Sequence, residues 1–167
     1  MNAESVLTSE DERRFGGLQR LYGVQGAHQI RQAHVVVVGI GGVGSWVAEA
    51  LARSGVARLT LVDMDHIAES NINRQIHALT NTTGQSKVAA MKERIALIHP
   101  ECQVAAVDEF VTPENWPTLL TEMPDALVDA CDQVRAKVVM ADWALTHQVG
   151  FVTVGAAGGK RLAHKVD

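Results

Sequence analysis

A glycine-rich turn near the start of the chain has the residue types and spacing that bind phosphate. Glycines stand at 39, 41, 42 and 44, after the apolar run Val35–Val38 and before a stretch with helical periodicity. Such a turn presents free backbone N–H groups and the positive end of a helix to a phosphate. A Cβ in the turn would hold a pyrophosphate away from the backbone. The turn is therefore predicted to bind a nucleotide through Gly39, Gly41, Gly42 and Gly44.

An acidic residue follows at the distance expected of a ribose-binding group. Asp63 ends the apolar run 59–62, nineteen residues beyond Gly44. Dinucleotide-binding domains place there the carboxylate that accepts hydrogen bonds from ribose hydroxyls. The glycine turn and Asp63 together predict a nucleotide site, for which a nicotinamide dinucleotide is the default ligand.

The polar segment 71–75 favours a triphosphate instead. It contains Asn71, Asn73, Arg74 and Gln75, for which a redox domain has no need so soon after the ribose acid. An arginine pairs with phosphate oxygens through two N–H groups, while amides orient the remaining atoms. Taken alone, Arg74 could equally form a surface ion pair.

Three further charged residues are predicted to reach the same crevice. Lys87 falls in the first turn of a predicted helix, where it could place a positive charge beside phosphates. Asp129 and Asp132 follow a later predicted strand, and a carboxylate there could hold Mg²⁺ together with phosphate oxygens. Each position also has an ordinary structural explanation, Lys87 as a solvated helix lysine and Asp132 as a helix N-cap. Their convergence on one crevice favours the nucleotide site.

The elements that must position these groups alternate along the chain. Strands are predicted at 34–38, 59–63, 103–107, 126–129 and 151–154, and helices at 42–54, 85–98, 113–122 and 134–147. This alternation requires right-handed crossovers and a parallel sheet. We therefore expect an α/β, Rossmann-like doubly wound, mostly parallel sheet of order 3-2-1-4-5. Ligands should collect at the carboxyl ends of strands one, two and four.

The helical segments are amphipathic, and the chain is expected to form an arm and one domain. Val43, Trp46 and Val47 begin an apolar repeat along 42–54, while Val134, Val138, Ala141 and Leu145 share one face of 134–147. Residues 1–33 are predicted to form an N-terminal helical arm. Residues 34–167 are predicted to form a Rossmann-like nucleotide-binding domain, truncated at its C-terminal side because no helix closes the sheet.

Composition limits the class of protein. A hydrophobic fraction of 47% with 20% charged residues is ordinary for a globular α/β domain. No apolar run approaches membrane-spanning length, and Cys102 and Cys131 form no Cys-x-x-Cys pair. We therefore expect a cytoplasmic protein with free thiols and no membrane partner. The net charge of −4 argues mildly against a chain that grips nucleic acid mainly through phosphates.

The motifs together resemble the ubiquitin-activating-enzyme superfamily, with its ThiF, MoeB and HesA members. Some bacterial members are adenylyltransferases that activate sulfur-carrier proteins. The residues that carry the resemblance are the glycine turn, Asp63-x-Asp65, Ser70-Asn71-x-Asn73-Arg74-Gln75, Gly84-x-x-Lys87 and Asp129-x-x-Asp132.

This resemblance implies ATP and Mg²⁺ as cofactors and adenylation as the reaction. It assigns Asp63 to the ribose, and Asn71, Arg74 and Lys87 to the phosphates, with Asp65 and Gln75 in the same site. Asp132 would place Mg²⁺ and the substrate carboxylate, and Arg74, Lys87 and Asp132 would form the catalytic set. A carboxylate oxygen would attack the α-phosphate as pyrophosphate leaves, a reaction that depends on positioning and charge neutralisation.

Two segments are similar to a narrower branch, the enzymes that dehydrate threonylcarbamoyladenosine in tRNA. They are Arg14-Phe15-Gly16-Gly17-Leu18-x-Arg20-Leu21-Tyr22-Gly23 and Gly155-Ala156-Ala157-Gly158-Gly159-Lys160. The resemblance implies tRNA as substrate and a homodimer in which Arg14 or Arg20 reaches the neighbour's site. Basic residues should then share one face despite the net charge: Arg13, Arg14, Arg20, Arg31, Lys160, Arg161 and Lys165.

Three alternatives stay open at this stage. The same adenylation chemistry could activate the C-terminal glycine of a ubiquitin-like sulfur-carrier protein, with a sulfur-transfer or carrier protein as partner. A nicotinamide-dependent oxidoreductase is a remote second alternative, since the glycine turn is common to both classes. A non-catalytic nucleotide-binding module is the third.

Overall fold

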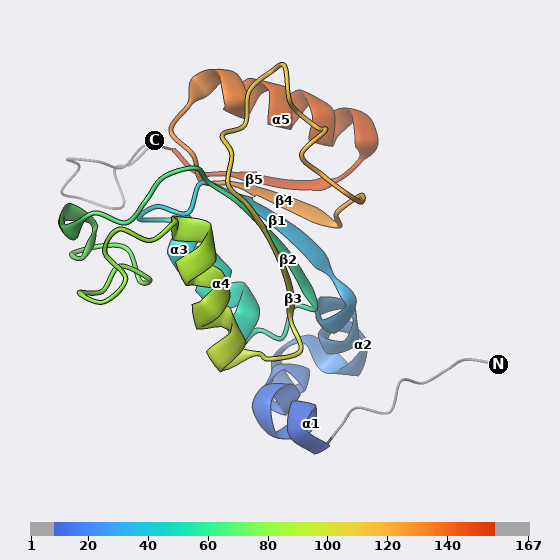
Figure 1. Ribbon diagram of the computed structural model, residues 1–167. Helices are drawn as coiled ribbons and strands as arrows, with labels where there is room; N and C mark the ends of the chain where they lie inside the picture. Colours follow the sequence, from blue (N-terminus) through green and yellow to red (C-terminus); the bar gives the residue numbers. More distant parts are fainter. Residues whose placement is uncertain (1–8, 156–167) are drawn as a thin grey trace.

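A five-stranded parallel sheet forms the centre of the computed structural model, which describes residues 9–155 (Figure 1). The strand order is β3-β2-β1-β4-β5. The strands are β1 (His34–Val38), β2 (Arg58–Val62), β3 (Gln103–Val107), β4 (Ala126–Asp129) and β5 (Gly150–Thr153). The predicted α/β class, the parallel sheet and the strand order are therefore confirmed.

The central strand β1 is buried on both faces, as its run of valines predicts. Val36 lies in register with Thr60 of β2 and Leu127 of β4. Val35 and Val37 belong to one apolar core, whereas Val36 and Val38 belong to the other. Because successive side chains of a strand point to opposite faces, one short strand serves both cores.

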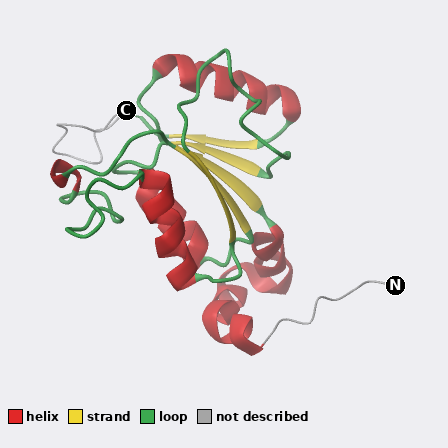
Figure 2. Cartoon of the chain, in the orientation of Figure 1, coloured by secondary structure: helices red, strands yellow, loops and turns green. Residues whose placement is uncertain are grey.

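Helices cover the two faces of the sheet. Helices α3 (Gly44–Arg53) and α4 (Lys87–Ile98) lie on one face, and α5 (Val134–His147) lies on the other (Figures 1 and 2). The chain begins with α1 (Ser9–Phe15), η1 (Gly16–Leu18) and α2 (Gln19–Gln32), and a short η2 (Glu69–Asn71) interrupts the long connection after β2.

The N-terminal helices pack at the amino ends of the strands. The Phe15 ring is buried and lies 4.7 Å from the His99 ring, centroid to centroid. The Arg14 Nη1 donates to the carbonyl of Ile98 at 2.9 Å. Since Ile98 and His99 precede β3, the arm lies opposite the carboxyl edge of the sheet. The boundary between residues 33 and 34 stays a prediction.

The predicted helix at 113–122 is wrong, because turns occupy this segment. The Asn115 side chain accepts a hydrogen bond from the Thr112 N–H and donates to the Phe110 carbonyl, both at 2.8 Å. Pro117 has no N–H and disfavours helical geometry at the residue before it. The segment instead packs Val111 and Trp116 into the core beneath α5.

The apolar repeats misplace the buried faces of α3 and α5. The buried side of α5 consists of Ala136, Met140 and Ala144, and Val134, Val138 and Leu145 are exposed. On α3 the buried residues are Gly44, Ser45, Ala48, Glu49 and Ala52, while Trp46 is 52% exposed. Mostly small residues face the sheet on both helices, and this allows the close packing that interiors require.

Gly44 offers a direct test of this packing. A Cβ there would lie 1.7 Å from the Gly39 carbonyl oxygen, so Gly44→Ala should lower the free energy of unfolding by about 2–3 kcal/mol. Gly17 is the control, since a Cβ there meets no heavy atom of a more distant residue within 4 Å. Gly17→Ala should change stability by less than about 1 kcal/mol in urea unfolding. Equal effects of the two substitutions would contradict the close contact at Gly44.

A nucleotide-sized pocket at the carboxyl edge of the sheet

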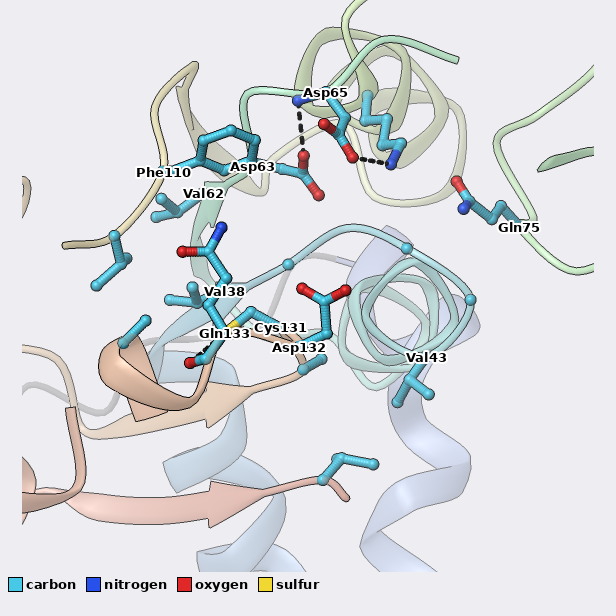
Figure 3. A pocket seen from close by; sticks show the side chains of 18 of the residues that line it. Val38, Val43, Val62, Asp63, Asp65, Gln75, Phe110, Cys131, Asp132 and Gln133 are labelled. Carbon is cyan, nitrogen blue, oxygen red and sulfur yellow. Dashed lines mark hydrogen bonds and ion pairs between the residues drawn. The ribbon is translucent and has the colours of Figure 1, made fainter. Parts of the chain in front are cut away.

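A pocket of about 600 Å³ opens at the carboxyl ends of β1, β2 and β4 (Figure 3). At this edge the connection after β1 runs to α3 on one face, and the connection after the neighbouring β4 runs to α5 on the other. Such a switch point is the usual ligand position in open α/β sheets. The volume lies within the range of pockets that hold small organic ligands and cofactors. Most of the residues predicted for the nucleotide site line the pocket wall: Gly39, Gly41, Gly42, Asp63, Asp65, Asn71, Arg74, Gln75, Lys87 and Asp132. Gly44, Asn73 and Asp129 do not.

Gly44 lies just behind the wall, as the first residue of α3. The glycine turn between β1 and α3 has a fixed backbone. Gly39 adopts a φ of +86° and donates its N–H to the Val62 carbonyl at 2.8 Å. A side chain on Gly39 would collide with the Ala130 backbone, 2.8 Å from its Cβ position. The turn therefore packs between the ends of β2 and β4, and Gly41 and Gly42 line the cavity.

The Asp63 carboxylate holds the turn from the β2 side. Its Oδ2 accepts the Ile40 N–H at 2.6 Å, and its Oδ1 accepts the Asp65 N–H at 2.8 Å. The side chain is buried, so both bonds form away from solvent. Each carboxylate oxygen has a second lone pair, which leaves capacity for a hydroxyl donor from the cavity.

Lys87 is buried in the pocket wall, and its alternative as a solvated helix lysine is wrong. Its residue is 6% exposed, and its Nζ lies 2.7 Å from the Asp65 Oδ2. The Lys87 N–H also donates to the Asp65 carbonyl at 3.0 Å. Lys87 is the first residue of α4, so the helix start and Asp65 place the ammonium at the cavity.

Two side chains of the 71–75 segment, Asn71 and Arg74, form hydrogen bonds with residues close to them in the sequence. The Arg74 Nη1 donates to the Ser70 carbonyl at 2.8 Å and to the Asn73 Oδ1 at 2.9 Å. Asn71 accepts the Ala68 N–H through its Oδ1 at 3.0 Å. Gln75 is buried, and its Oε1 has no hydrogen-bond partner within residues 9–155.

The two carboxylates after β4 have different environments. Asp132 is exposed and points into the pocket (Figure 3). Its explanation as the N-cap of α5 is wrong, because Gln133 holds that position. Asp129 is fully buried and accepts hydrogen bonds from Lys137 and Thr153. Asp132 is therefore the carboxylate of this pair that could hold a metal ion.

The donor set suits Mg²⁺ bound through a phosphate. Across the part of the chain that the structure describes, no three His, Cys, Asp or Glu side chains converge as an all-protein metal cluster. Mg²⁺ is usually held by one or two carboxylates together with substrate phosphates and water. A single exposed carboxylate, Asp132, beside the glycine turn is consistent with that mode.

Other wall residues come from segments without a recognisable motif. Phe110 and Val111 precede the turns at 113–119, Gln133 is the N-cap residue of α5, and Val154 follows β5. Cys131 also lines the wall, and burial first, then its hydrogen bond to Asp129, raises the pKa of its thiol to about 11. The thiol is therefore protonated at neutral pH and unsuited to nucleophilic attack.

The predicted arm arginines lie far from the pocket of their own chain. Arg14 binds the Ile98 carbonyl at the amino edge of the sheet, and Arg20 is exposed on α2 (Figure 1). The residues Ala156–Lys160, Arg161 and Lys165, predicted to carry the narrower resemblance and part of a basic face, lie outside the described residues.

Comparison with known proteins decides the family. A model of the ThiF family matches residues 15–161, most of the chain. The chain belongs to the ThiF family. Its predicted membership of the ubiquitin-activating-enzyme superfamily, with ThiF among its members, is therefore confirmed.

The ThiF-family relatives include a tRNA-modifying enzyme. The chain is 48% identical to the tRNA threonylcarbamoyladenosine dehydratase of Haemophilus influenzae, over 89% of this chain and 57% of that protein. The Escherichia coli dehydratase in complex with ATP has a TM-score of 0.91 and 44% identity, over 96% of this chain and 66% of that one. A sulfur carrier protein adenylyltransferase of Thermus thermophilus is 33% identical over 74% of this chain and 45% of its own.

The chain thus spans little more than half the length of the curated dehydratases that it matches. Within residues 9–155, no helix is both long and apolar enough to cross a membrane.

Buried His77, behind the wall, predicts a pH dependence of stability. Burial, and then Lys87 and Arg94, lower its pKa from 6.5 to about 4. The unfolded chain binds this proton first, so folding stability is full above pH 6.5 and falls as the pH drops toward 4. The His77 contribution to that loss should reach about 3 kcal/mol.

Urea unfolding between pH 7 and pH 4.5 measures this effect. His77→Leu should flatten the decline, whereas replacement of exposed His28 by glutamine should leave its slope unchanged. A His77→Leu variant that declines as steeply as the parent chain would contradict the assignment.

Proposed function

We propose that the chain is the nucleotide-binding part of an ATP-dependent adenylating enzyme that acts on threonylcarbamoyladenosine in tRNA. The observation that carries the proposal is the pocket itself, where a glycine turn, Arg74, Lys87 and Asp132 meet at one sheet edge. The ThiF-family match and the ATP complex of the Escherichia coli dehydratase support ATP as the nucleotide.

The wall residues then take distinct roles toward ATP. Gly39, Gly41, Gly42 and Gly44 give the turn close access to phosphates, and Asp63 accepts from the ribose with its remaining lone pairs. Asn71, Arg74, Gln75 and Lys87 bind the phosphates, with Asp65 holding the Lys87 ammonium until a phosphate replaces it. Asp132 holds Mg²⁺, which neutralises phosphate charge when bound.

Adenylation requires little covalent chemistry from these side chains. A substrate carboxylate oxygen forms a bond to the α-phosphorus as the bond to the pyrophosphate oxygen breaks. Arg74 and Lys87 offset the charge that develops on the departing pyrophosphate. The carbamoyl group beside the activated carboxylate then attacks it, expels AMP and closes a ring, with net loss of water. Proximity within one molecule favours that second step.

The acidic net charge is compatible with a tRNA substrate if basic groups are unevenly distributed. The 48% identity to a tRNA-modifying relative supports a carboxylate carried by tRNA, rather than one carried by another molecule, as the substrate. We also place the enzyme in the cytoplasm, where its proposed substrate is made.

We also propose a homodimer, which the position of the arm supports. Arg14 and Arg20 lie at the amino edge of their own sheet, away from their own pocket. An arm arginine that contributes to a nucleotide site must therefore act on the pocket of a second copy of the chain.

A sulfur-carrier substrate is the second candidate. The Thermus thermophilus relative, a sulfur carrier protein adenylyltransferase, favours it at 33% identity. Adenylation of a C-terminal glycine would use the same wall residues. The ThiF-family match supports neither a nicotinamide oxidoreductase nor a non-catalytic nucleotide-binding module.

AMP release from ATP tests the substrate. The complete protein should release AMP with tRNA that carries the threonylcarbamoyl group and not with tRNA that lacks it. Arg74→Ala should reduce this rate at least 100-fold, because a phosphate-binding charge is lost. The control is Arg53→Ala on α3, which removes an exposed arginine that pairs with Glu49. It should leave the rate of AMP release unchanged. AMP release with a glycine-ending carrier protein alone would instead establish the second candidate.

A further inference from the structure

A charged cluster around one fully buried carboxylate lies directly behind the pocket, between β4, α5 and β5. The Asp129 carboxylate is fully buried. Its Oδ2 accepts hydrogen bonds from the Lys137 Nζ at 2.9 Å and from the Thr153 Oγ1 at 2.6 Å. Its Oδ1 accepts the Cys131 N–H at 3.2 Å. Lys137 also donates to the Val154 carbonyl at 2.9 Å, so one ammonium joins the ends of two strands.

The cluster fixes two segments of the pocket wall. Its bond to the Cys131 N–H shapes the turn that leaves β4 and carries Asp132 into the cavity (Figure 3). Its bond to the Val154 carbonyl sets the path of the chain from β5 to Gly155, which also lines the cavity. The Lys137 ammonium donates to Asp129, to Thr153 and to the Val154 carbonyl, so its hydrogen bonds act on the two wall segments through Asp129, Thr153 and the backbone.

Stability alone is a poor explanation for such a cluster. Taking two charges out of water costs free energy that their attraction often fails to offset, and apolar replacements of buried pairs are frequently as stable. Loss of one partner leaves an uncompensated buried charge. An ion pair differs from apolar packing in its geometric specificity, because each of its hydrogen bonds fixes the position of one atom in a neighbouring segment.

We propose that Asp129 and Lys137 are positioning residues, which hold the Asp132 carboxylate and the end of β5 in the geometry that binds Mg²⁺ with ATP. This role rests on the proposed function, because it takes ATP as the ligand. Groups that orient metal ligands typically change metal affinity 10- to 100-fold when they are replaced.

A double-mutant cycle between Lys137 and Asp132 tests the proposal. The measured quantity is the ATP affinity with and without Mg²⁺, by calorimetry on the parent chain, Lys137→Met, Asp132→Asn and the double variant. Lys137→Met should reduce the gain in affinity from Mg²⁺ about 10-fold. It should add little to the loss caused by Asp132→Asn, because both act on the same carboxylate.

Further variants separate positioning from folding. Lys137→Arg should retain most of the Mg²⁺ effect, since it keeps the charge, and Lys92→Met on the exposed side of α4 should retain all of it. Thr153→Val removes one hydrogen bond to Asp129 while the ion pair stays, so it tests the cluster if Lys137→Met fails to fold. Cooperative urea unfolding confirms that each variant is folded.

The outcomes are distinguishable. Independent losses that multiply in the double variant, or equal losses of ATP affinity with and without Mg²⁺, would overturn the positioning role and leave the proposed function intact. A parent chain that binds ATP no more tightly with Mg²⁺ would overturn the proposed use of the metal, and this role with it.

Discussion

The pocket depends on one buried carboxylate, Asp63, at the end of β2. Its two oxygens accept the N–H groups of Ile40 and Asp65 at 2.6 and 2.8 Å. The first bond fixes the glycine turn after β1, and the second fixes the start of the long connection that delivers Arg74 and Lys87. Two chain segments that must face each other across a ligand therefore share a single anchor, buried where water competes little for its hydrogen bonds.

The same arrangement recurs at β4. There the buried Asp129 accepts hydrogen bonds from Lys137, Thr153 and the Cys131 N–H, whereas the exposed Asp132 faces the cavity. At β2 the buried Asp63 is followed by Asp65, whose side chain is 53% exposed. At each strand end the first acid organises the backbone and the second faces the ligand. This division explains why paired acids at short spacing mark both ends of the pocket.

Much of the fold and most of the wall could be predicted from sequence. The alternating strands and helices determine a parallel sheet, and a parallel sheet brings Gly39, Asp63 and Asp132 to one edge whatever the details of packing. The family resemblance added the roles, which no spacing rule contains. Lys87 shows the value of combining the strand topology with the family resemblance, because a single lysine on a helix would otherwise be predicted to face solvent.

The failures have physical causes that sequence patterns do not express. Apolar periodicity marks the faces of α3 and α5 that carry large side chains, yet mostly small residues such as Ala48 and Ala144 lie against the sheet. The segment 113–122 has a favourable helix start, but Pro117 and the Asn115 side chain select turns. Lys137 reaches Asp129 across a strand–turn–helix connection, a pairing that becomes visible only once the topology is known.

The identity of the nucleotide is the claim on which everything else rests, and calorimetric titration of the chain tests it most directly. ATP and NAD would be titrated separately, each in the presence of Mg²⁺. We predict one ATP per chain and far weaker binding of NAD, because the wall offers a triphosphate the cations Arg74 and Lys87 and the exposed Asp132 carboxylate that we propose holds Mg²⁺. Tighter binding of NAD than of ATP would contradict ATP as the nucleotide and would favour a nicotinamide-dependent oxidoreductase.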